Sequence, residues 1–590
     1  MSRSCRRWLL RGSYSFCFLL LAMIPTVRAQ DLLLQGGTLV DGTGSPPRPA
    51  DVLIRDGRIV AVGANLDAAA SDIINIGGLV VAPGFIDLHS HAEAGLSDPY
   101  LSAARNNVTQ GITTVVVGQD GLHGWPLGSS LTEQTALWRR QGVGTNVVPL
   151  AGQGIARIES IGPSREEATA EQAAKVGARV ESVLAEGAWG ISTGLGYFPG
   201  RNSSTEEIIA ATRPVAHVDG FYITHLRDQG DGLLESIDEA IRICREAGVR
   251  CVITHIKTAG ARNWGKADEA IARIKAARAE GVPVYADLYP YRVSDNGIDF
   301  TPVPLRFVFS REDVATLFSP VELTPDAAVR WSYRVDPALH SRYRLETLVK
   351  QPWPLVAELI GASDRVRRER AYRYAIRECL EDESRTAALL ERVDAHIGGT
   401  EGAAHIQITR HPDPALVGLP LADAASQRGA SAARTAVDLT LEGAAFTSFQ
   451  MAEEDIVSFT REPFVAVGTD GRVPEYGFGT VHPRSYGTFT RRLRRYVFDR
   501  KVIDLAEAIR TSTGLPAEIV GLEDRGLVRE GFWADLVVLD PDDVRDRASY
   551  SEPHRYSEGI EWVIVNGEIV VGEGKPTGRK AGRVLLKTEL

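Results

Sequence analysis

The chain has little cysteine for its length. Only five of its 590 residues are cysteines, and Cys5 and Cys17 lie in the first 29 residues. The remaining Cys244, Cys251 and Cys379 are too few and too scattered for a disulfide framework or a CxxC metal site. Stability therefore has to come from a large core, which a hydrophobic share of 44% allows.

An excess of positive charge is also missing. The formal net charge is −10, whereas a protein that binds nucleic acid needs a concentrated basic surface. This excludes nucleic acid as the main partner. One arginine-rich stretch does occur, and we expect it to be the solvated face of a helix. It comprises Arg491, Arg492, Arg494 and Arg495.

Long hydrophobic runs are absent after the N-terminal region, which itself has the pattern of an export signal. Its basic head comprises Arg3, Arg6, Arg7 and Arg11. A short apolar run from Phe16 to Ile24 follows, and small residues at Val27–Ala29 would permit cleavage before Gln30. Because this run is short for a bilayer span, we expect residues 1–29 to be a signal peptide. A retained anchor is the alternative. The mature protein is then expected to be soluble, without a stable membrane span, and periplasmic or secreted.

Both ends of the remaining chain are rich in predicted strands. Short β-rich runs alternate with turns from Asp31 to Val81, and ADLVVLD and GIEWVIVNGEIVVGEG repeat the pattern near the C-terminus. We expect residues 30–83 and 514–590 to form one composite β-sandwich beside a central domain.

Eight apolar, β-rich runs recur in the central region, and several are separated by segments of helical periodicity. They are GFIDLHSH, TTVVVGQDG, NVVPLAGQG, WGISTGLGY, FYITHLRD, RCVITHIK, VYADLYPY and FVAVGTDG. Eight parallel strands alternating with helices predict an α/β fold, a (β/α)₈ TIM barrel, built from residues 84–293 and 405–513. The carboxyl ends of such strands converge on one rim, so polar residues there meet in space.

The connection after the seventh run is too long for a simple loop. Residues 294–404 contain segments of helical pattern that are rich in arginine, glutamate and aromatics. We expect a mostly helical insert that forms a lid beside the rim after strand seven. A disordered insert is the alternative.

The strongest local signal is a pair of histidines, His89 and His91, at the end of the first run. Residues two apart in an extended chain point to the same side. His225, His255 and Asp470 end the fifth, sixth and eighth runs. Four histidines and a carboxylate on one rim predict a site for a borderline metal such as zinc.

These residues resemble a family. The amidohydrolase superfamily has HxH on strand one, histidines on strands five and six and an aspartate on strand eight. Within it, the chain is similar to the N-acyl-D-amino-acid deacylase (D-aminoacylase) group over nearly all of the mature chain except the insert. The matching runs are APGFIDLHSH, GITTVVVGQDG, GAWGISTGLGYFPG, YITHLRDQGD, ITHIKTAGARNWGK, ADLYPY, VGTDG, HPRSYGTF, GFWADLVVLD and the C-terminal tail.

The chain departs from this group after strand two. Asp120 stands where the group usually has a metal-binding cysteine. A carboxylate can still bind and bridge metals, so we interpret Asp120 as a ligand rather than a turn residue. Strand four carries no lysine of the kind that many superfamily members carboxylate, which favours Asp120 as the source of negative charge. Gln153 stands where a histidine is often found, and we assign it no role.

The resemblance implies metal-assisted hydrolysis of an amide with one or two zinc ions, although other divalent metals would serve. Asp470 would carry the proton from water to the departing nitrogen, and Tyr197 would donate a hydrogen bond to the carbonyl oxygen. Lys257, Tyr291 and Arg484 would hold the carboxylate of a small-molecule substrate. A structural ion pair is the alternative for Arg484.

Other activities remain open at this point. A cyclic amidase of the hydantoinase or dihydropyrimidinase kind and a dipeptidase use the same scaffold. A secreted, non-catalytic metal or ligand binder belongs to a different class. The sequence determines neither the preferred acyl group and amino acid nor the oligomeric state, and D-stereochemistry rests on the resemblance alone.

Overall fold

The computed structural model describes residues 31–66, 72–124, 130–294, 301–304, 307, 372–399, 402–478 and 481–589. The predicted signal peptide and most of the predicted insert lie outside these residues. In the described ranges, none of the helices combines the length and the apolar character that crossing a bilayer requires.

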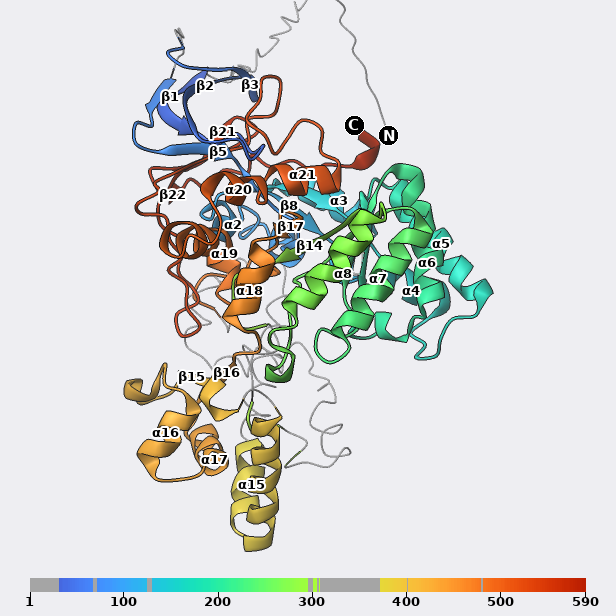
Figure 1. The fold of residues 1–590 in the computed structure, drawn as a ribbon, viewed down its shortest axis with the longest axis vertical. Coiled ribbons are helices and arrows are strands. Elements are labelled where there is room, and N and C mark those ends of the chain that lie inside the picture. The colour runs from blue at the N-terminus through green and yellow to red at the C-terminus, as the bar shows by residue number, and fades with distance from the viewer. Residues whose placement is uncertain are drawn as a thin grey trace, which may run out of the picture.

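Strands from the two chain ends pair in one sheet. Its nine described strands follow the order β22-β21-β20-β19-β5-β1-β2-β3, with β4 beside β1 (Figure 1). The N-terminal and C-terminal halves meet where β5 pairs with β19 in antiparallel orientation. The strands are β1 (Leu32–Leu39), β2 (Arg48–Arg55), β3 (Arg58–Gly63), β4 (Asp72–Asn75), β5 (Val80–Pro83), β19 (Leu536–Leu539), β20 (Ile560–Val565), β21 (Glu568–Gly572) and β22 (Lys575–Pro576).

Each of the eight predicted central runs contains a strand, and the strands are parallel. They are β6 (Phe85–Asp87) with β7 (Ser90–His91), β8 (Ile112–Val117), β9 (Asn146–Pro149) with β10 (Ala151–Gly152), β11 (Gly190–Gly194), β12 (Phe221–His225), β13 (Arg250–Ile253), β14 (Val284–Leu288), and β17 (Val465–Val467) with β18 (Gly471–Arg472). In the described residues their hydrogen bonds form three separate sheets rather than one closed barrel sheet. The orders are β6-β8-β9, β10-β11-β12-β13-β14-β17 and β18-β7. The β7–β18 pair places strand eight beside strand one.

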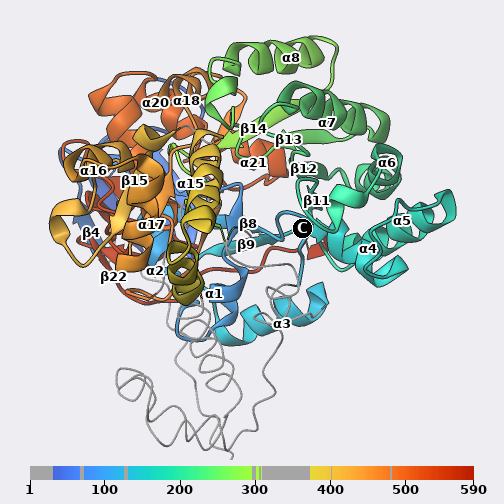
Figure 2. The same ribbon diagram turned by 90° about the horizontal axis from the view of Figure 1, so that it is seen from below.

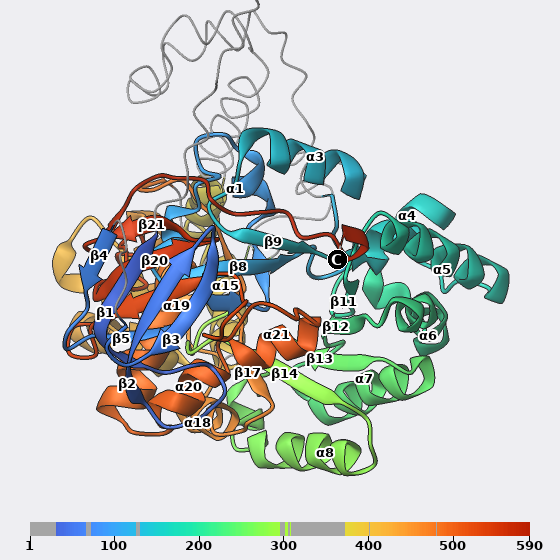
Figure 3. The same cartoon turned by 90° about the horizontal axis from the view of Figure 1, so that it is seen from above.

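Helices cover the outside of these strands, as Figures 2 and 3 show for α4 to α8. Helix α7 illustrates why: its buried residues, among them Leu233, Ile237 and Cys244, recur at helical spacing, and Gly248 ends it in the left-handed conformation. The helices around the strands are α1 (Glu93–Ser97), α2 (Arg105–Val108), α3 (Leu131–Gln141), α4 (Gln153–Ile161), α5 (Ala170–Ala185), α6 (Thr205–Thr212), α7 (Leu233–Ala247), α8 (Ala267–Ala279), α18 (Glu453–Thr460), α19 (Arg484–Arg492), α20 (Leu505–Arg510), α21 (Gly514–Val520) and a π-helical turn, Leu493–Asp499. Short 3₁₀ turns span Gly200–Asn202, Arg213–Val218, Ala261–Asn263, Ala403–His405, Pro414–Leu416 and Lys587–Glu589.

A small unit with its own hydrophobic core lies below the barrel in Figure 1. It contains a helix at 372–380, α15 (Glu383–Gly398), α16 (Leu421–Arg428), α17 (Ala432–Glu442) and an antiparallel pair, β15 (Ile406–Arg410) with β16 (Ala445–Ser448). The described part of the insert is therefore mostly helical. Residues beyond 404, which the sequence analysis assigned to the barrel, also contribute to this unit.

Only part of the arginine-rich stretch is the solvated helix face that we expected. Arg492 is 3% exposed, and it donates hydrogen bonds to the Ala508 carbonyl at 3.2 Å and to the Thr511 hydroxyl at 2.8 Å. Arg491 lies 4.8 Å above the Tyr291 ring. The prediction was wrong for Arg491 and Arg492 because the helix packs against α20 and the strand-seven loop, which its own sequence does not reveal. The side chains of Arg494 and Arg495 are 29% and 40% exposed and do lie on the solvent side.

A buried polar network joins the barrel to the terminal sheet. Asn146, at the start of β9, donates a hydrogen bond to Asp535 at 3.0 Å, and Asp535 also forms an ion pair with Arg525. Asn566 completes the network, because it accepts from Arg525 at 2.9 Å and donates to Asn146 at 2.8 Å. Arg525 and Asp535 are each 4% exposed, so each charge is compensated by the other rather than by solvent.

Replacing Asp535 by alanine tests this junction. Removing one partner of a buried ion pair leaves the other charge uncompensated, which typically costs about 3–5 kcal/mol. We expect the free energy of unfolding in urea to fall by an amount in this range. The matched control is Asp31→Ala, which removes the partner of Arg55 in an exposed pair at 2.7 Å and should have little effect. Equal losses in the two variants would contradict the role of the junction.

Candidate metal centre

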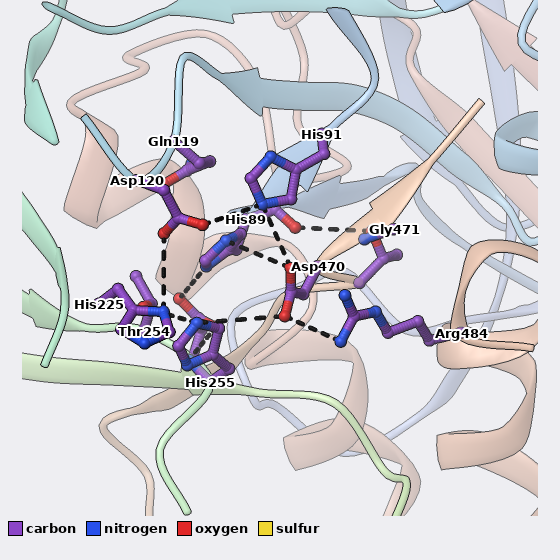
Figure 4. A network of polar contacts seen from close by, with 12 residues as sticks. His89, His91, Gln119, Asp120, His225, Thr254, His255, Asp470, Gly471 and Arg484 are labelled. Atoms are coloured by element: carbon purple, nitrogen blue, oxygen red, sulfur yellow. Dashed lines mark hydrogen bonds and ion pairs between the residues drawn. The ribbon is translucent and has the colours of Figure 1, made fainter. Parts of the chain in front are cut away.

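The six predicted metal ligands come together at the carboxyl ends of five strands (Figure 4). They are His89 and His91 on strand one, Asp120 after β8, His225 at the end of β12, His255 after β13 and Asp470 after β17. Residues separated by up to 381 positions, 470 minus 89, thus share one rim of the barrel. This is the convergence that parallel strands predict.

The two carboxylates occupy the middle of the cluster. His91 Nε2 lies 3.3 Å from an Asp120 oxygen and 3.2 Å from an Asp470 oxygen. Asp470 is also 3.7 Å from His89 Nε2 and 4.0 Å from His255 Nε2, and Asp120 is 4.0 Å from His225 Nδ1. Two groups of potential ligand atoms lie within 4.8 Å of one another, namely His89, His91 and Asp470, and His89, Asp120 and His255.

Three of these residues have an unusual backbone conformation. The φ angles are 59° at Asp120, 35° at His255 and 49° at Asp470. L-residues other than glycine seldom adopt the left-handed region, and each such residue costs about 1–2 kcal/mol. All three residues lie shortly after the end of a strand, and all three side chains belong to the cluster. The backbone strain is therefore associated with the site.

The carboxylates are held in their charged form. Burial by itself would raise the pKa of Asp470, but the Arg484 guanidinium, 2.9 Å away, and the His91 imidazole hold that pKa well below its usual value. Burial likewise opposes ionisation of Asp120, yet the hydrogen bond and charge of His91 lower its pKa. Both side chains therefore offer anionic oxygens at neutral pH.

Two histidines are held neutral. Burial lowers the pKa of His225 to about 4, and burial together with the charge of Lys257 lowers the pKa of His255 well below its usual value. A neutral imidazole has the free lone pair that a metal requires. The side chains of His91 and His225 remain 24% and 22% exposed, so the cluster is accessible from their side.

His91 behaves differently. Burial opposes its charge, but Asp120 and Asp470 raise the pKa of its imidazole well above the usual value. A protonated His91 thus compensates the carboxylates in the protein without metal. Several other buried atoms of the cluster lack hydrogen-bond partners, namely His89 Nε2, Asp120 Oδ1, His225 Nδ1 and the Tyr197 hydroxyl. Unpaired imidazole and carboxylate atoms around one point fit a divalent cation.

The predicted substrate-binding residues are only partly brought together. Lys257 Nζ lies 2.9 Å from His255 Nδ1, and Arg484 contacts Asp470, so both border the cluster. Burial, reinforced by the charge of Arg484, lowers the pKa of Lys257 to about 7 although Asp470 opposes this shift. Tyr197 is also at the site, with its ring 4.9 Å from that of His225.

Tyr291 lines one cavity together with His255, Lys257 and Tyr289, but its hydroxyl does not point at either basic side chain. Its hydroxyl donates to the Pro483 carbonyl at 3.4 Å. The tyrosine beside the cations is Tyr289, whose ring is 4.9 Å from the Arg484 guanidinium and 5.4 Å from Lys257 Nζ. Strand β14 ends at Leu288, so the chain has left the regular strand at YPY and the sequence spacing gave no basis for choosing between the two tyrosines.

The sequence analysis also missed residues behind the ligands. Asp287 accepts a hydrogen bond from the His255 backbone N–H at 2.8 Å, and Gln229 lies 2.9 Å from His255 Nδ1. Gln153 has a structural contact outside the cluster, because it donates to Glu207 at 3.0 Å. The motif ADLYPY predicted strand β14, but nothing in the sequence distinguished Asp287 as a residue of the site.

A TIM-barrel fold with histidines and carboxylates gathered at its carboxyl rim defines a class of metal-dependent hydrolases. The chain belongs to the amidohydrolase family, whose model matches residues 72–287 and 456–571. The predicted family, fold and enzyme class are confirmed. The unmatched stretch, 288–455, includes the small unit below the barrel.

Known relatives are similar along the whole chain. A D-aminoacylase of Alcaligenes xylosoxydans xylosoxydans is 32% identical over 95% of this chain and 98% of its own. The structure of a D-aminoacylase with a binuclear metal centre superposes with a TM-score of 0.67 at 30% identity, covering 94% of this chain and all of the other. The N-acyl-D-glutamate deacylase of Bordetella bronchiseptica, solved with zinc and a phosphonate inhibitor, gives a TM-score of 0.65 at 28% identity, with coverages of 94% and 99%.

Metal affinity is expected to depend on pH through His91. Because the carboxylates keep this imidazole protonated near neutral pH, an incoming metal must displace its proton. The apparent zinc affinity of the metal-free protein should therefore rise at least about tenfold per pH unit between about pH 6 and 7. The slope can exceed this value because, although burial opposes its charge, the neighbouring Asp287 carboxylate and the charge of Asp470 raise the pKa of His89 as well. His225, with a pKa of about 4, should release no proton in this range. Competition with a chromophoric chelator at several pH values measures the slope, and a pH-independent affinity would contradict the assignment.

Proposed function

We propose that this protein removes the acyl group from N-acyl-D-amino acids by metal-dependent hydrolysis. The observation that carries the proposal is the position of two buried cations, Lys257 and Arg484, beside a cluster of four histidines and two aspartates. Such a site offers metal ligands for an amide and a cationic anchor for an adjacent carboxylate. The full-length similarity to a D-aminoacylase and an N-acyl-D-glutamate deacylase supports the same reaction.

We assign the metal to the six ligands of the rim. His89, His91 and Asp470 would hold one ion, and Asp120, His225 and His255 would hold a second where two are bound. When present, zinc polarises the amide carbonyl and makes a water molecule more acidic. Neutral His225 and His255 and anionic Asp120 and Asp470 suit this ion, for which the zinc complex of the Bordetella bronchiseptica enzyme is a precedent.

Asp470 is the proton carrier in this proposal. Its low pKa keeps it deprotonated, so it can accept a proton from water before it delivers that proton to the departing nitrogen. The ion pair with Arg484 fixes one of its oxygens. Burial and the negative charge of Asp120 raise the pKa of Tyr197, so its hydroxyl stays protonated and can donate to the oxygen that gains charge.

Substrate binding is assigned to Lys257, Arg484 and Tyr289. Arg484 can present a planar pair of N–H donors to a carboxylate, and the Tyr289 ring supports both cations. In the structure Arg484 contacts Asp470, which was the alternative raised for it. A substrate carboxylate would share this guanidinium with Asp470.

The competing activities are less well supported. A dihydropyrimidinase of Brevibacillus agri shares the fold at a TM-score of 0.52 but only 15% identity. Hydrolysis rates for N-acetyl-D- and N-acetyl-L-amino acids, dipeptides and hydantoin, measured on zinc-loaded protein, test the proposal. Preference for any class other than N-acyl-D-amino acids would overturn it, and a metal-loaded protein inert on the whole panel would favour a non-catalytic binder.

We also propose that the protein is exported. The basic, apolar and small residues of the first 29 positions support a signal peptide. N-terminal sequencing of the mature protein from a fractionated culture tests this, and an intact N-terminus in the cytoplasmic fraction would contradict it.

Asp470→Asn tests the proton carrier. Asparagine keeps the shape and one oxygen ligand but accepts no proton, so kcat should fall at least ~10²-fold. Far-ultraviolet circular dichroism and metal content should stay close to those of the original protein. A variant that keeps more than a few per cent of kcat would remove the role assigned to Asp470.

The two tyrosines of YPY provide a matched pair. Tyr289→Phe should raise KM for N-acyl-D-amino acids several-fold, because the ring beside Lys257 and Arg484 loses the hydroxyl that we assign to the substrate carboxylate, and should leave KM for the corresponding methyl esters nearly unchanged. Tyr291→Phe removes a hydroxyl that contacts Pro483 and should leave both KM values near those of the original protein. The reverse order of effects would restore the assignment of Tyr291.

A further inference from the structure

Behind the ligands lies a carboxylate that the proposed mechanism does not use. We propose that Asp287 is a positioning residue that orients His89 and His255 for metal binding through its two oxygens. This inference rests on the metal centre of the proposed function and is independent of which amide the enzyme cleaves.

Each carboxylate oxygen of Asp287 lies next to a different histidine. Asp287 lies in β14 and is fully buried. Its Oδ1 accepts the His255 backbone N–H at 2.8 Å, and its Oδ2 lies 3.8 Å from His89 Nδ1. That second oxygen has no hydrogen-bond partner, and neither has His89 Nδ1. A buried carboxylate oxygen without a partner is costly, so its position opposite an unpartnered ring nitrogen points to a shared role.

The His89 ring lies between two carboxylates. Nδ1 faces Asp287, whereas Nε2 lies 3.7 Å from Asp470 on the side of the cluster. A carboxylate that accepts Nδ1–H selects the tautomer whose Nε2 lone pair is free, and carboxylate–histidine–metal chains use this arrangement. Asp287 therefore determines which ring nitrogen of His89 is offered to the metal.

The second contact stabilises a strained turn. His255 has φ of 35°, and its N–H would be buried without a partner if Asp287 did not accept from it. The next backbone N–H, that of Ile256, donates to the Asp287 carbonyl at 2.8 Å. Asp287 thus holds the turn on both sides of the residue that presents the His255 ring.

Close packing prevents these groups from moving apart. A Cβ atom at Gly468, on strand eight, would lie 2.6 Å from His89 Cβ and 2.8 Å from Asp287 Oδ1. Only glycine at this position lets strand eight approach closely. The geometry of His89 and Asp287 is therefore built into the barrel before any metal arrives.

The test compares two buried aspartates. In Asp287→Asn the side chain can accept from the His255 N–H with its oxygen, but it then presents an NH₂ donor to His89, which favours the tautomer with Nε2 protonated. We expect zinc affinity, measured by chelator competition, to fall 10–100-fold, with a changed absorption spectrum of the cobalt-substituted protein. Excess zinc should restore much of the activity, which it would not do for a folding defect.

Asp455→Asn is the matched control. Asp455 is 4% exposed and accepts hydrogen bonds from Thr258 and from the Gly265 N–H, neither of which is a proposed ligand. Its variant should lose stability without losing zinc affinity. Should Asp287→Asn fail to fold, Asp287→Ser, which is smaller and uncharged, is measured in the same way.

Zinc affinity of the Asp287 variant within twofold of the original, with an unchanged cobalt spectrum, would overturn the inference. An equal loss of affinity in Asp455→Asn would overturn it as well. Because the readout is metal affinity, a failure here is distinct from a failure of the substrate panel.

Discussion

Two buried carboxylates, Asp120 and Asp470, face one imidazole, that of His91, and the site depends on how their negative charge is balanced. Both remain ionised in a region with little water, where like charges interact strongly. Such a pair needs a cation. Without metal the proton on His91 supplies it, and with metal the ion does. The same electrostatic demand explains why His91 is charged while the neighbouring His225 and His255 are neutral.

The barrel brings these charged and neutral side chains together through locally strained backbone turns. Parallel strands deliver side chains to one rim, but regular strand geometry alone does not aim consecutive residues inward. Left-handed turns at Asp120, His255 and Asp470 correct the direction, at a cost in stability. Rigid contacts behind the rim offset the cost: Asp287 holds the turn at His255, and the Asp470 N–H donates to the His89 carbonyl at 2.7 Å.

The strands and the convergence of the six candidate ligands could be predicted because each depends on local pattern. The apolar runs predicted the strands, and the polar residues at the ends of these runs predicted which histidines meet at the rim. Features set by tertiary partners could not be predicted. The burial of Arg492 depends on α20, and the choice between Tyr289 and Tyr291 depends on a turn after the strand. Asp287 matters only because the fold brings His89 of strand one opposite it. The sequence of a single run does not show which neighbouring strands it pairs with, so the division of the barrel into three hydrogen-bonded sheets could not be predicted.

The resemblance to the D-aminoacylase group implies a cysteine at the position of Asp120, and the carboxylate found there has a consequence for the metal. A thiolate is a soft ligand that favours zinc, whereas a carboxylate is hard and discriminates less against other divalent ions. Asp120 can use both oxygens, one toward His91 and one toward His225, and so can serve two ions without a sulfur bridge. Selectivity then has to come from the imidazoles. His89 and His255 are the most buried of these, so Asp287, which contacts both, becomes more important in this chain than it would be beside a thiolate.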